Sequence, residues 1–155
     1  MKQSQKIRQL ACKASENEYL HKDFHGALCF SINYLDDKYG AQTTEQFLRQ
    51  VAGNCYSPLI SKIKKQGLKA LREHWESIFS KEGGRFEIKY KKNALTLIVN
   101  ECPAVNHLKK IDLFFTDRFC EITRIVNDEI CKRAGFNSSC FYKKGQGRCV
   151  QKFWK

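Results

Sequence analysis

Long apolar runs are missing from this sequence of 155 residues. No stretch approaches the roughly 20 consecutive apolar residues that a membrane-spanning helix needs, and the N-terminal residues lack the apolar core of a signal peptide. We therefore expect a cytoplasmic protein with no membrane partner. Proline and glycine are scarce as well, with 2 and 9 residues, which leaves little material for a disordered linker. We expect residues 1–155 to form a single domain, with a helical half at 1–83 and a hairpin–helix–hairpin half at 84–155.

Acidic residues are few relative to basic ones. The chain has 28 Lys and Arg against 16 Asp and Glu, which gives a formal net charge of +12. Such a surplus permits binding to nucleic acid or another polyanion. The basic residues are nevertheless scattered along the chain, without an arginine-rich arm, a known nucleic-acid-binding signature or coinciding aromatic platforms. We therefore expect a solvated basic surface and do not expect nucleic acid as a partner.

Cysteine, by contrast, is abundant. The eight residues are Cys12, Cys29, Cys55, Cys102, Cys120, Cys131, Cys140 and Cys149. In a reducing compartment, so many thiols favour metal binding or thiol chemistry over disulfides. The alternative is that they are small buried hydrophobic residues, which we expect for at least half of them.

The first half of the chain has the apolar spacing of helices. Repeats at every third or fourth position predict helices over residues 4–16, 20–39, 43–51 and 68–79. Thr43 or Thr44 is placed to cap the third of these. Asn54 and Pro58 mark a break before the apolar spacing resumes, and Gly83 with the following glycine ends the helical half.

From residue 85 the apolar period changes from 3.6 to 2. Alternation over residues 86–90 and 95–99 predicts a β-hairpin with its turn at Lys92 and Asn93. Pro103 cannot donate to a strand ladder, so the chain must leave the sheet there. This places Cys102 at a strand-to-helix junction, where functional sites are often built, and makes it our first candidate.

A long helix is predicted over residues 112–134, with Gly135 ending it. Its apolar stripe consists of Phe115, Phe119, Ile122, Val126 and Ile130. Cys120 and Cys131 lie within about 20° of each other and nearly opposite this stripe. They either line a pocket or touch a second packing layer, and both alternatives remain open.

The tail reads as a second hairpin that carries Cys140 and Cys149. The spacing can bring these two thiols together across the strands, but it is not that of a zinc knuckle, and we favour a structural role for both. The predicted fold is therefore α+β, with an N-terminal helical layer packed on a twisted antiparallel sheet of two hairpins, in the order ββ-α-ββ in the C-terminal half.

Two histidines sit one turn apart on the predicted helix 20–39. His21, His25 and Cys29 share one face at i, i+4 spacing, as metal ligands on helices often do. The alternative is that they are satisfied core or boundary residues beside an apolar stripe.

The order of the C-terminal motifs resembles a known group of proteins. The motifs are Cys102-Pro103, Phe119-Cys120-Glu121, Gly135-Phe136-Asn137 and Gly145-Gln146-Gly147-Arg148-Cys149. They are similar to those of the L-2-amino-thiazoline-4-carboxylic acid hydrolase-like family and, more distantly, of the 4-vinyl reductase-type small-molecule-binding domains related to TRAPP transport subunits. The resemblance is best over residues 84–154. It implies an α+β fold, a ligand pocket or metal-linked site that involves Cys102, Cys120 and Cys149, and, for the hydrolase-like branch, the opening of a sulfur–nitrogen heterocycle.

Three functions are compatible with these features, and a small-molecule hydrolase is our first choice. The predicted catalytic residues are Cys102, Cys120 and His25. The predicted substrate-binding residues are Arg124 and Asn127. If the site holds a divalent zinc, iron or manganese ion, its predicted ligands are His21, His25, Cys102 and Cys120. The second function is a non-catalytic sensor domain that binds a small molecule or a metal. A basic nucleic-acid-binding module comes third, and a homodimer through the helical half is compatible with this architecture.

Overall fold

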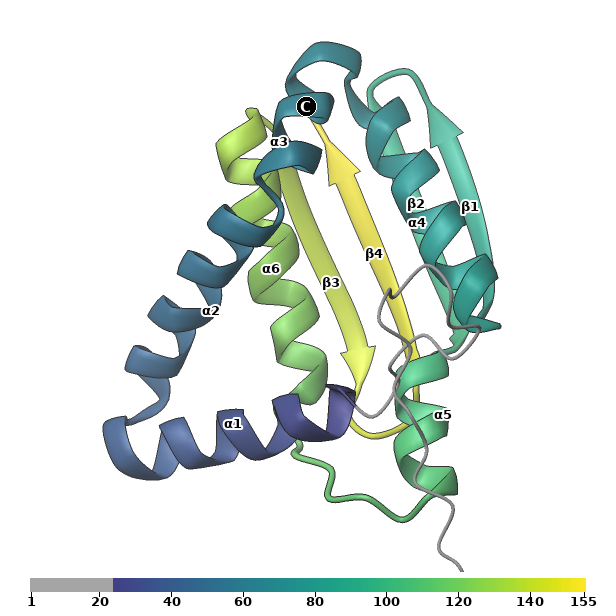
Figure 1. The fold of residues 1–155 in the computed structure, drawn as a ribbon. Coiled ribbons are helices and arrows are strands. Elements are labelled where there is room, and N and C mark those ends of the chain that lie inside the picture. The colour runs from purple at the N-terminus through teal and green to yellow at the C-terminus, as the bar shows by residue number, and fades with distance from the viewer. Residues whose placement is uncertain (1–23) are drawn as a thin grey trace, which may run out of the picture.

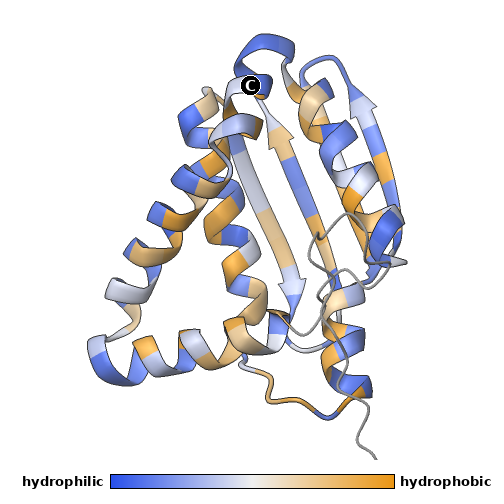
Figure 2. Cartoon of the chain, in the orientation of Figure 1, coloured by the Kyte–Doolittle hydropathy of each residue, from blue (hydrophilic) through white to orange (hydrophobic). Residues whose placement is uncertain are grey.

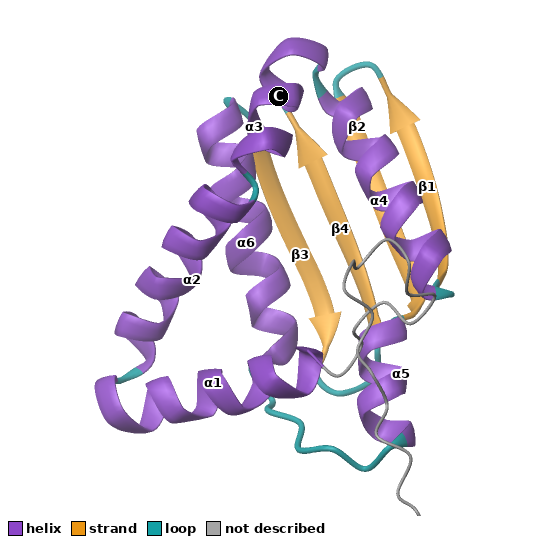
Figure 3. Cartoon of the chain, viewed as in Figure 1, coloured by secondary structure: helices purple, strands orange, loops and turns teal. Residues whose placement is uncertain are grey.

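The computed structural model describes residues 24–155 (Figure 1). Its elements are, in chain order, α1 (Phe24–Tyr39), α2 (Ala41–Cys55), α3 (Ser57–Gln66), α4 (Leu68–Glu82), β1 (Arg85–Lys91), β2 (Ala94–Glu101), α5 (Pro103–Lys110), α6 (Phe119–Ala134), β3 (Asn137–Lys143) and β4 (Arg148–Trp154). The protein is α+β, as predicted, with helices first and two hairpins in the C-terminal half (Figure 3). The helix predicted over 4–16 and the start of the helix predicted over 20–39 lie outside the described residues.

A four-stranded antiparallel sheet, in the order β1-β2-β4-β3, forms the centre of the described fold. The two hairpins join because β2 pairs with β4, which sets Leu97 opposite Gln151 and Val99 opposite Cys149. Side chains alternate between the two faces of a strand. These four residues therefore lie on one face of the sheet, the face toward α4 and α6, which is called the inner face below. Figure 2 shows the matching alternation of apolar and polar residues along β1.

The main core lies between the inner face and the helices. Leu95, Leu97, Val99 and Phe153 from the strands pack with Leu71, Trp75 and Phe79 of α4 and with Ile130 of α6. Full burial of a leucine or phenylalanine side chain contributes about 1.5–3 kcal/mol, so this layer fixes α4 and α6 on the sheet. A smaller cluster of Cys29, Ala104, Val105, Leu108 and Phe119 joins α1, α5 and the start of α6.

Two predicted boundaries are wrong. The long helix begins at Phe119 rather than at residue 112, because α5 occupies residues 103–110 and Asp112 has a positive φ of 51° that no helix continues through. Pro103 lies in the first turn of α5, where its fixed φ suits a helix start. Neither Thr43 nor Thr44 caps α2, because both lie inside the helix. The N-cap is Gly40, and the Thr44 hydroxyl donates back to the Gly40 carbonyl at 3.4 Å.

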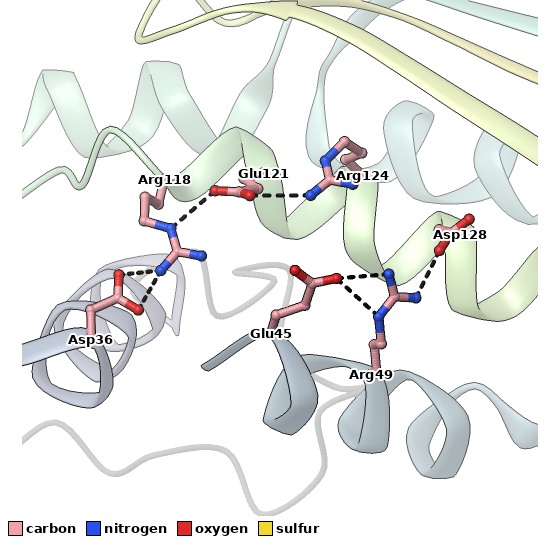
Figure 4. Close-up of polar contacts among 7 residues, drawn as sticks. All are labelled: Asp36, Glu45, Arg49, Arg118, Glu121, Arg124 and Asp128. Carbon is pink, nitrogen blue, oxygen red and sulfur yellow. Dashed lines mark hydrogen bonds and ion pairs between the residues drawn. The ribbon is translucent and has the colours of Figure 1, made fainter. Parts of the chain in front are cut away.

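Ion pairs connect α1 and α2 to α6 (Figure 4). The residues involved are Asp36, Glu45, Arg49, Arg118, Glu121, Arg124 and Asp128. Arg118, just before α6, reaches Asp36 on α1, and that carboxylate raises the pKa of the guanidinium. Arg49 on α2 donates to Asp128 on α6 at 2.7 Å. These side chains are partly exposed, so each pair contributes about 1 kcal/mol or less.

Within residues 24–155, no helix has both the length and the apolar character needed to cross a membrane.

Candidate functional site: a thiol-lined cavity

A small cavity lies between the inner face of the sheet and the helices. Its volume is about 100 Å³, and its wall is mostly apolar. Four cysteines from four different elements reach it: Cys102 after β2, Cys120 on α6, Cys140 on β3 and Cys149 on β4. Their convergence is the most distinctive chemical feature of the described fold.

Strand register places the two hairpin thiols together. Cys140 pairs with Gln151, and Tyr142 pairs with Cys149, so Cys140 and Cys149 are diagonal neighbours on the inner face. Such diagonal neighbours lie within reach of each other's side chains. The four-residue turn between β3 and β4 sets this register, since Lys143 pairs with Arg148.

Cys102 is held by a backbone hydrogen bond to the same turn. Its N–H donates to the Gly147 carbonyl at 2.8 Å. Gly147 has a φ of +65°, a conformation that a residue with a side chain rarely adopts. The end of β2 is therefore tied to the β3–β4 turn, and the Cys102 thiol faces the thiols of the hairpin.

Cys149 is the most acidic of these thiols. The Cys140 thiol donates a hydrogen bond to it and lowers its pKa from 9.0 to about 7, against the opposing effect of burial. Gln151 Nε2 donates a second hydrogen bond to the Cys149 sulfur at 3.3 Å. Cys140, as the donor, has a raised pKa. Near neutral pH, a larger fraction of Cys149 is therefore ionised than of an ordinary thiol.

Cys102 and Cys120 remain protonated thiols at neutral pH. Burial raises the pKa of Cys102 to about 11, although backbone groups of Val105 and Ala104 at the start of α5 act in the opposite direction. Burial also raises the pKa of Cys120, and the nearby Cys149 adds to that shift. Since the thiolate is the nucleophile, neither residue is activated in this arrangement.

A buried amide pair orients the donor to Cys149. Asn127 on α6 is 2% exposed, and its Nδ2 donates to Gln151 Oε1 at 2.7 Å. With its oxygen occupied in this way, Gln151 turns its NH₂ group to the Cys149 sulfur. Asn127, which was predicted to bind substrate, therefore orients the Gln151 amide that donates to the Cys149 sulfur. It also borders a neighbouring cavity.

The neighbouring cavity has a volume of about 250 Å³ and shares part of the same wall. The shared residues are Trp75, Phe79, Cys102, Phe119 and Thr123. His25 lines only this second cavity, where its ring meets Phe119 edge-on with 5.9 Å between centroids. Trp75 Nε1 is buried and has no hydrogen-bond partner among the described residues.

The predicted site residues are thus partly brought together. Cys102 and Cys120 share the first cavity, whereas His25 shares only the second cavity with Cys102. Arg124 is partly exposed and pairs with Glu121 on its own helix. His21 lies outside the described residues. Residues 24–155 contain no group of three or more His, Cys, Asp or Glu placed to hold a metal ion.

The two helix thiols that looked alike in the sequence have different surroundings. Cys120 lines the cavity, whereas Cys131 is buried in the main core beside Ile130. Burial raises the pKa of Cys131 to about 12. Of the two alternatives considered for these thiols, lining a pocket therefore applies to Cys120, and contact with a packing layer applies to Cys131.

Spacing alone favoured a structural role for Cys140 and Cys149, whereas the family resemblance implied a pocket that involves Cys149, and the structure places both thiols in the cavity wall. The sequence contained a signal that these two thiols share one face of the sheet. Once the turn length sets the register, alternation puts residues 140, 142, 149 and 151 on one face. The hydrogen bond that makes Cys149 acidic has no sequence signal, because it depends on the diagonal neighbour.

Comparisons of this chain with family models, with curated proteins and with solved structures give no match. The resemblance to the hydrolase-like family and to the 4-vinyl reductase-type domains stays a prediction.

Proposed function

We propose that this protein binds a small, mostly apolar molecule in the thiol-lined cavity, with the Cys149 thiolate as the group that meets the ligand. The observation that carries the proposal is the convergence of four thiols on one apolar cavity, with one of them made acidic by another. An apolar pocket with a few convergent polar groups and a perturbed pKa is the usual form of a ligand site. A reducing compartment such as the cytoplasm would keep these thiols available.

The cavity dimensions limit the ligand. A cavity of about 150 Å³ holds a benzene ring in another protein. The first cavity, at about 100 Å³, is smaller, so a ligand with one six-membered ring would extend across the shared wall into the second cavity of about 250 Å³. Trp75 borders both cavities with a buried N–H that lacks a partner among the described residues. An unsatisfied buried donor costs about 1–3 kcal/mol. The proposed ligand therefore carries one hydrogen-bond acceptor on an apolar body.

Hydrolysis is the second candidate function, and one observation favours it: Cys102 and His25 line the same cavity. A Cys–His pair can act as nucleophile and base. Against this, burial raises the pKa of Cys102 to about 11, and the described residues that line the first cavity include no His, Asp or Glu. Binding is therefore better supported than ring-opening hydrolysis.

Protection of Cys149 from alkylation tests the binding proposal. Pyridine and benzene serve as probes, since both are small apolar rings and only pyridine carries an acceptor. Iodoacetamide labelling of Cys149, followed by peptide mass spectrometry, is expected to slow in a saturable manner with pyridine. Thr123→Met fills space in both cavities and is expected to abolish the protection, whereas Thr96→Met on the opposite face of the sheet is the matched control.

Two results would overturn the binding proposal. One is labelling that neither probe slows, and the other is protection that Thr123→Met leaves intact. Metal content of protein purified without an affinity tag tests the metal-linked variant separately. Stoichiometric zinc, iron or manganese that is lost in both Cys102→Ala and His25→Ala would restore the predicted metal site.

A further inference from the structure

The second face of the sheet, called the outer face here, is exposed and basic. Alternation directs every second residue of each strand to this face. Five exposed basic side chains share it: Lys89, Lys91, Lys143, Arg148 and Lys152. Glu87 is the one exposed acidic residue among its described strand positions, and Asn100 donates to that carboxylate at 3.3 Å. The outer face therefore carries a strong positive potential within a chain of net charge +12.

Two aromatic side chains stand among these cations. Phe141 on β3 is 65% exposed, and Trp154 on β4 is 40% exposed. Phe141 pairs with Val150, four residues before Trp154 on the neighbouring strand. Strand dimensions put the two aromatic positions about 14 Å apart. The sequence-based expectation that basic and aromatic residues do not coincide is therefore wrong for this face of the sheet.

A shallow groove of about 340 Å³ crosses the outer face beside Phe141. The apolar side chains of Ile98 and Val150 form its floor, and Lys143 and Arg148 stand at its edge. A groove with an apolar floor, an aromatic ring and flanking cations offers stacking surface and phosphate neutralisation together.

We propose that the outer face of the sheet binds single-stranded nucleic acid, with bases stacked on Phe141 and Trp154 and phosphates neutralised by the surrounding lysines and Arg148. The outer face exposes both cations and aromatic rings, and its ligand should contact both. A polyanion without flat faces would use the cations and leave the aromatic rings in water, whereas a neutral apolar partner would bury five charges. A duplex hides the faces of its bases by stacking, so its bases could not stack on Phe141 and Trp154.

Fluorescence anisotropy with labelled oligo(dT) and oligo(U) of about ten nucleotides tests the proposal. If the five cations contact phosphates, the slope of log K against log salt is about −3.5, from −0.7 per contact on a single strand. Lys143→Glu with Lys152→Glu is expected to weaken binding about tenfold or more and to reduce the slope by about 1.4. The matched control, Lys64→Glu with Lys65→Glu on the exposed side of α3, makes the same change in net charge away from the sheet.

Stacking has a separate readout. Phe141→Ala is expected to lower affinity by about fivefold or more at unchanged salt slope. Oligo(U) is expected to quench tryptophan fluorescence, and the quenching is expected to disappear in Trp154→Phe, since Trp75 lies in the core on the other side of the sheet. Comparison of oligo(dU) with oligo(U), which share the same base, shows whether the sugar contributes.

Several outcomes would overturn the proposal. Equal weakening by the outer-face pair and by the α3 pair would mean diffuse attraction rather than a site. Equal affinity for a duplex of the same length, with no effect of Phe141→Ala, would remove the stacking surface. A dimer that Phe141→Ala converts to a monomer would instead make the outer face an interface between copies of this chain. Thr123→Met changes only the inner cavities and is expected to leave nucleic-acid binding intact, so the two proposals fail independently.

Discussion

Removal of the Cys140 thiol is expected to deactivate Cys149. In Cys140→Ala the hydrogen bond that lowers the Cys149 pKa is lost while the burial that raises it remains, so the pKa is expected to return from about 7 to 9.0 or above. At pH 7 the thiolate fraction then falls roughly 50-fold. A more basic thiolate is a better nucleophile, by roughly six- to tenfold over two pKa units. Alkylation of Cys149 is therefore expected to slow by about five- to eightfold.

The pH dependence of alkylation measures this effect directly. Trypsin cleaves after Arg148 and Lys152, so the peptide 149–152 carries Cys149 alone. The iodoacetamide rate at that peptide, followed by mass spectrometry between about pH 5 and 10, reports the apparent pKa. Cys140→Ser keeps a hydroxyl donor at the same position and is expected to retain most of the acidity. Cys55→Ser removes an exposed thiol on α2 and controls for background labelling.

The argument for an activated Cys149 fails under either of two results. An apparent pKa near 9 in the wild type would mean that the Cys140 hydrogen bond does not form. An unchanged low pKa in Cys140→Ala would assign the acidity to another group, and the Gln151 amide would then be the candidate.

Three further predictions concern stability. Asn127→Ala leaves the buried Gln151 oxygen without its donor and is expected to lower the free energy of unfolding by about 1–3 kcal/mol in urea titrations. Stability should fall as pH rises from about 9 to 11, because the Cys102 thiol ionises more readily in the unfolded chain, with pKa 9.0, than in the fold, with pKa about 11. The resulting loss in the free energy of unfolding reaches about 2–3 kcal/mol and should be absent in Cys102→Ala. Arg118→Ala, which breaks the contact with Asp36, should cost about 1 kcal/mol and speed hydrogen exchange in α1 more than elsewhere.

Each of these predictions has a control and a contradicting result. Asn33→Ala removes an exposed amide that donates to Asp37, and a loss as large as that of Asn127→Ala would refute the burial argument. An identical pH dependence of stability above pH 9 in the wild type and in Cys102→Ala would show that groups other than Cys102 cause the fall. Lys62→Ala breaks an exposed ion pair with Glu73 and should leave stability nearly unchanged, and a loss in this variant as large as in Arg118→Ala would refute the argument for the Asp36 contact.

The local elements of this protein were largely readable from periodicity. The period of 2 over residues 86–90 and 95–99 and the turn at Lys92 and Asn93 agree with β1 and β2. Gly83 follows the end of α4 in a left-handed conformation, as expected of a helix stop. The break around Pro58 separates α2 from α3. These features depend on neighbours within a few residues, which is why the sequence alone predicts them.

The start of α6 was misjudged for a physical reason. Residues 111–118 carry an apolar spacing that matches a helix, but Leu113 and Phe115 pack against the cluster around α5 from a loop. Burial against a distant element, rather than helical periodicity, explains their apolar character. The same limit applies to His25. Periodicity predicted the helix that carries it, but not that His25 lines the second cavity while Cys120 lines the first.

The sequence by itself determined the α+β order of elements, the junction at Cys102 and the surplus of positive charge. Tertiary structure alone decided that Cys102, Cys120, Cys140 and Cys149 meet at one cavity, that Cys149 is the thiol that ionises, and that the aromatic side chains of the hairpins share a face with the lysines. The physical reason is that the meeting of the four thiols depends on the pairing of β2 with β4 and on the packing of α6 across the sheet, which bring together residues far apart in the chain. The acidity of Cys149 depends on a side-chain hydrogen bond between β3 and β4, and no local pattern encodes that bond even where the hairpin register is readable.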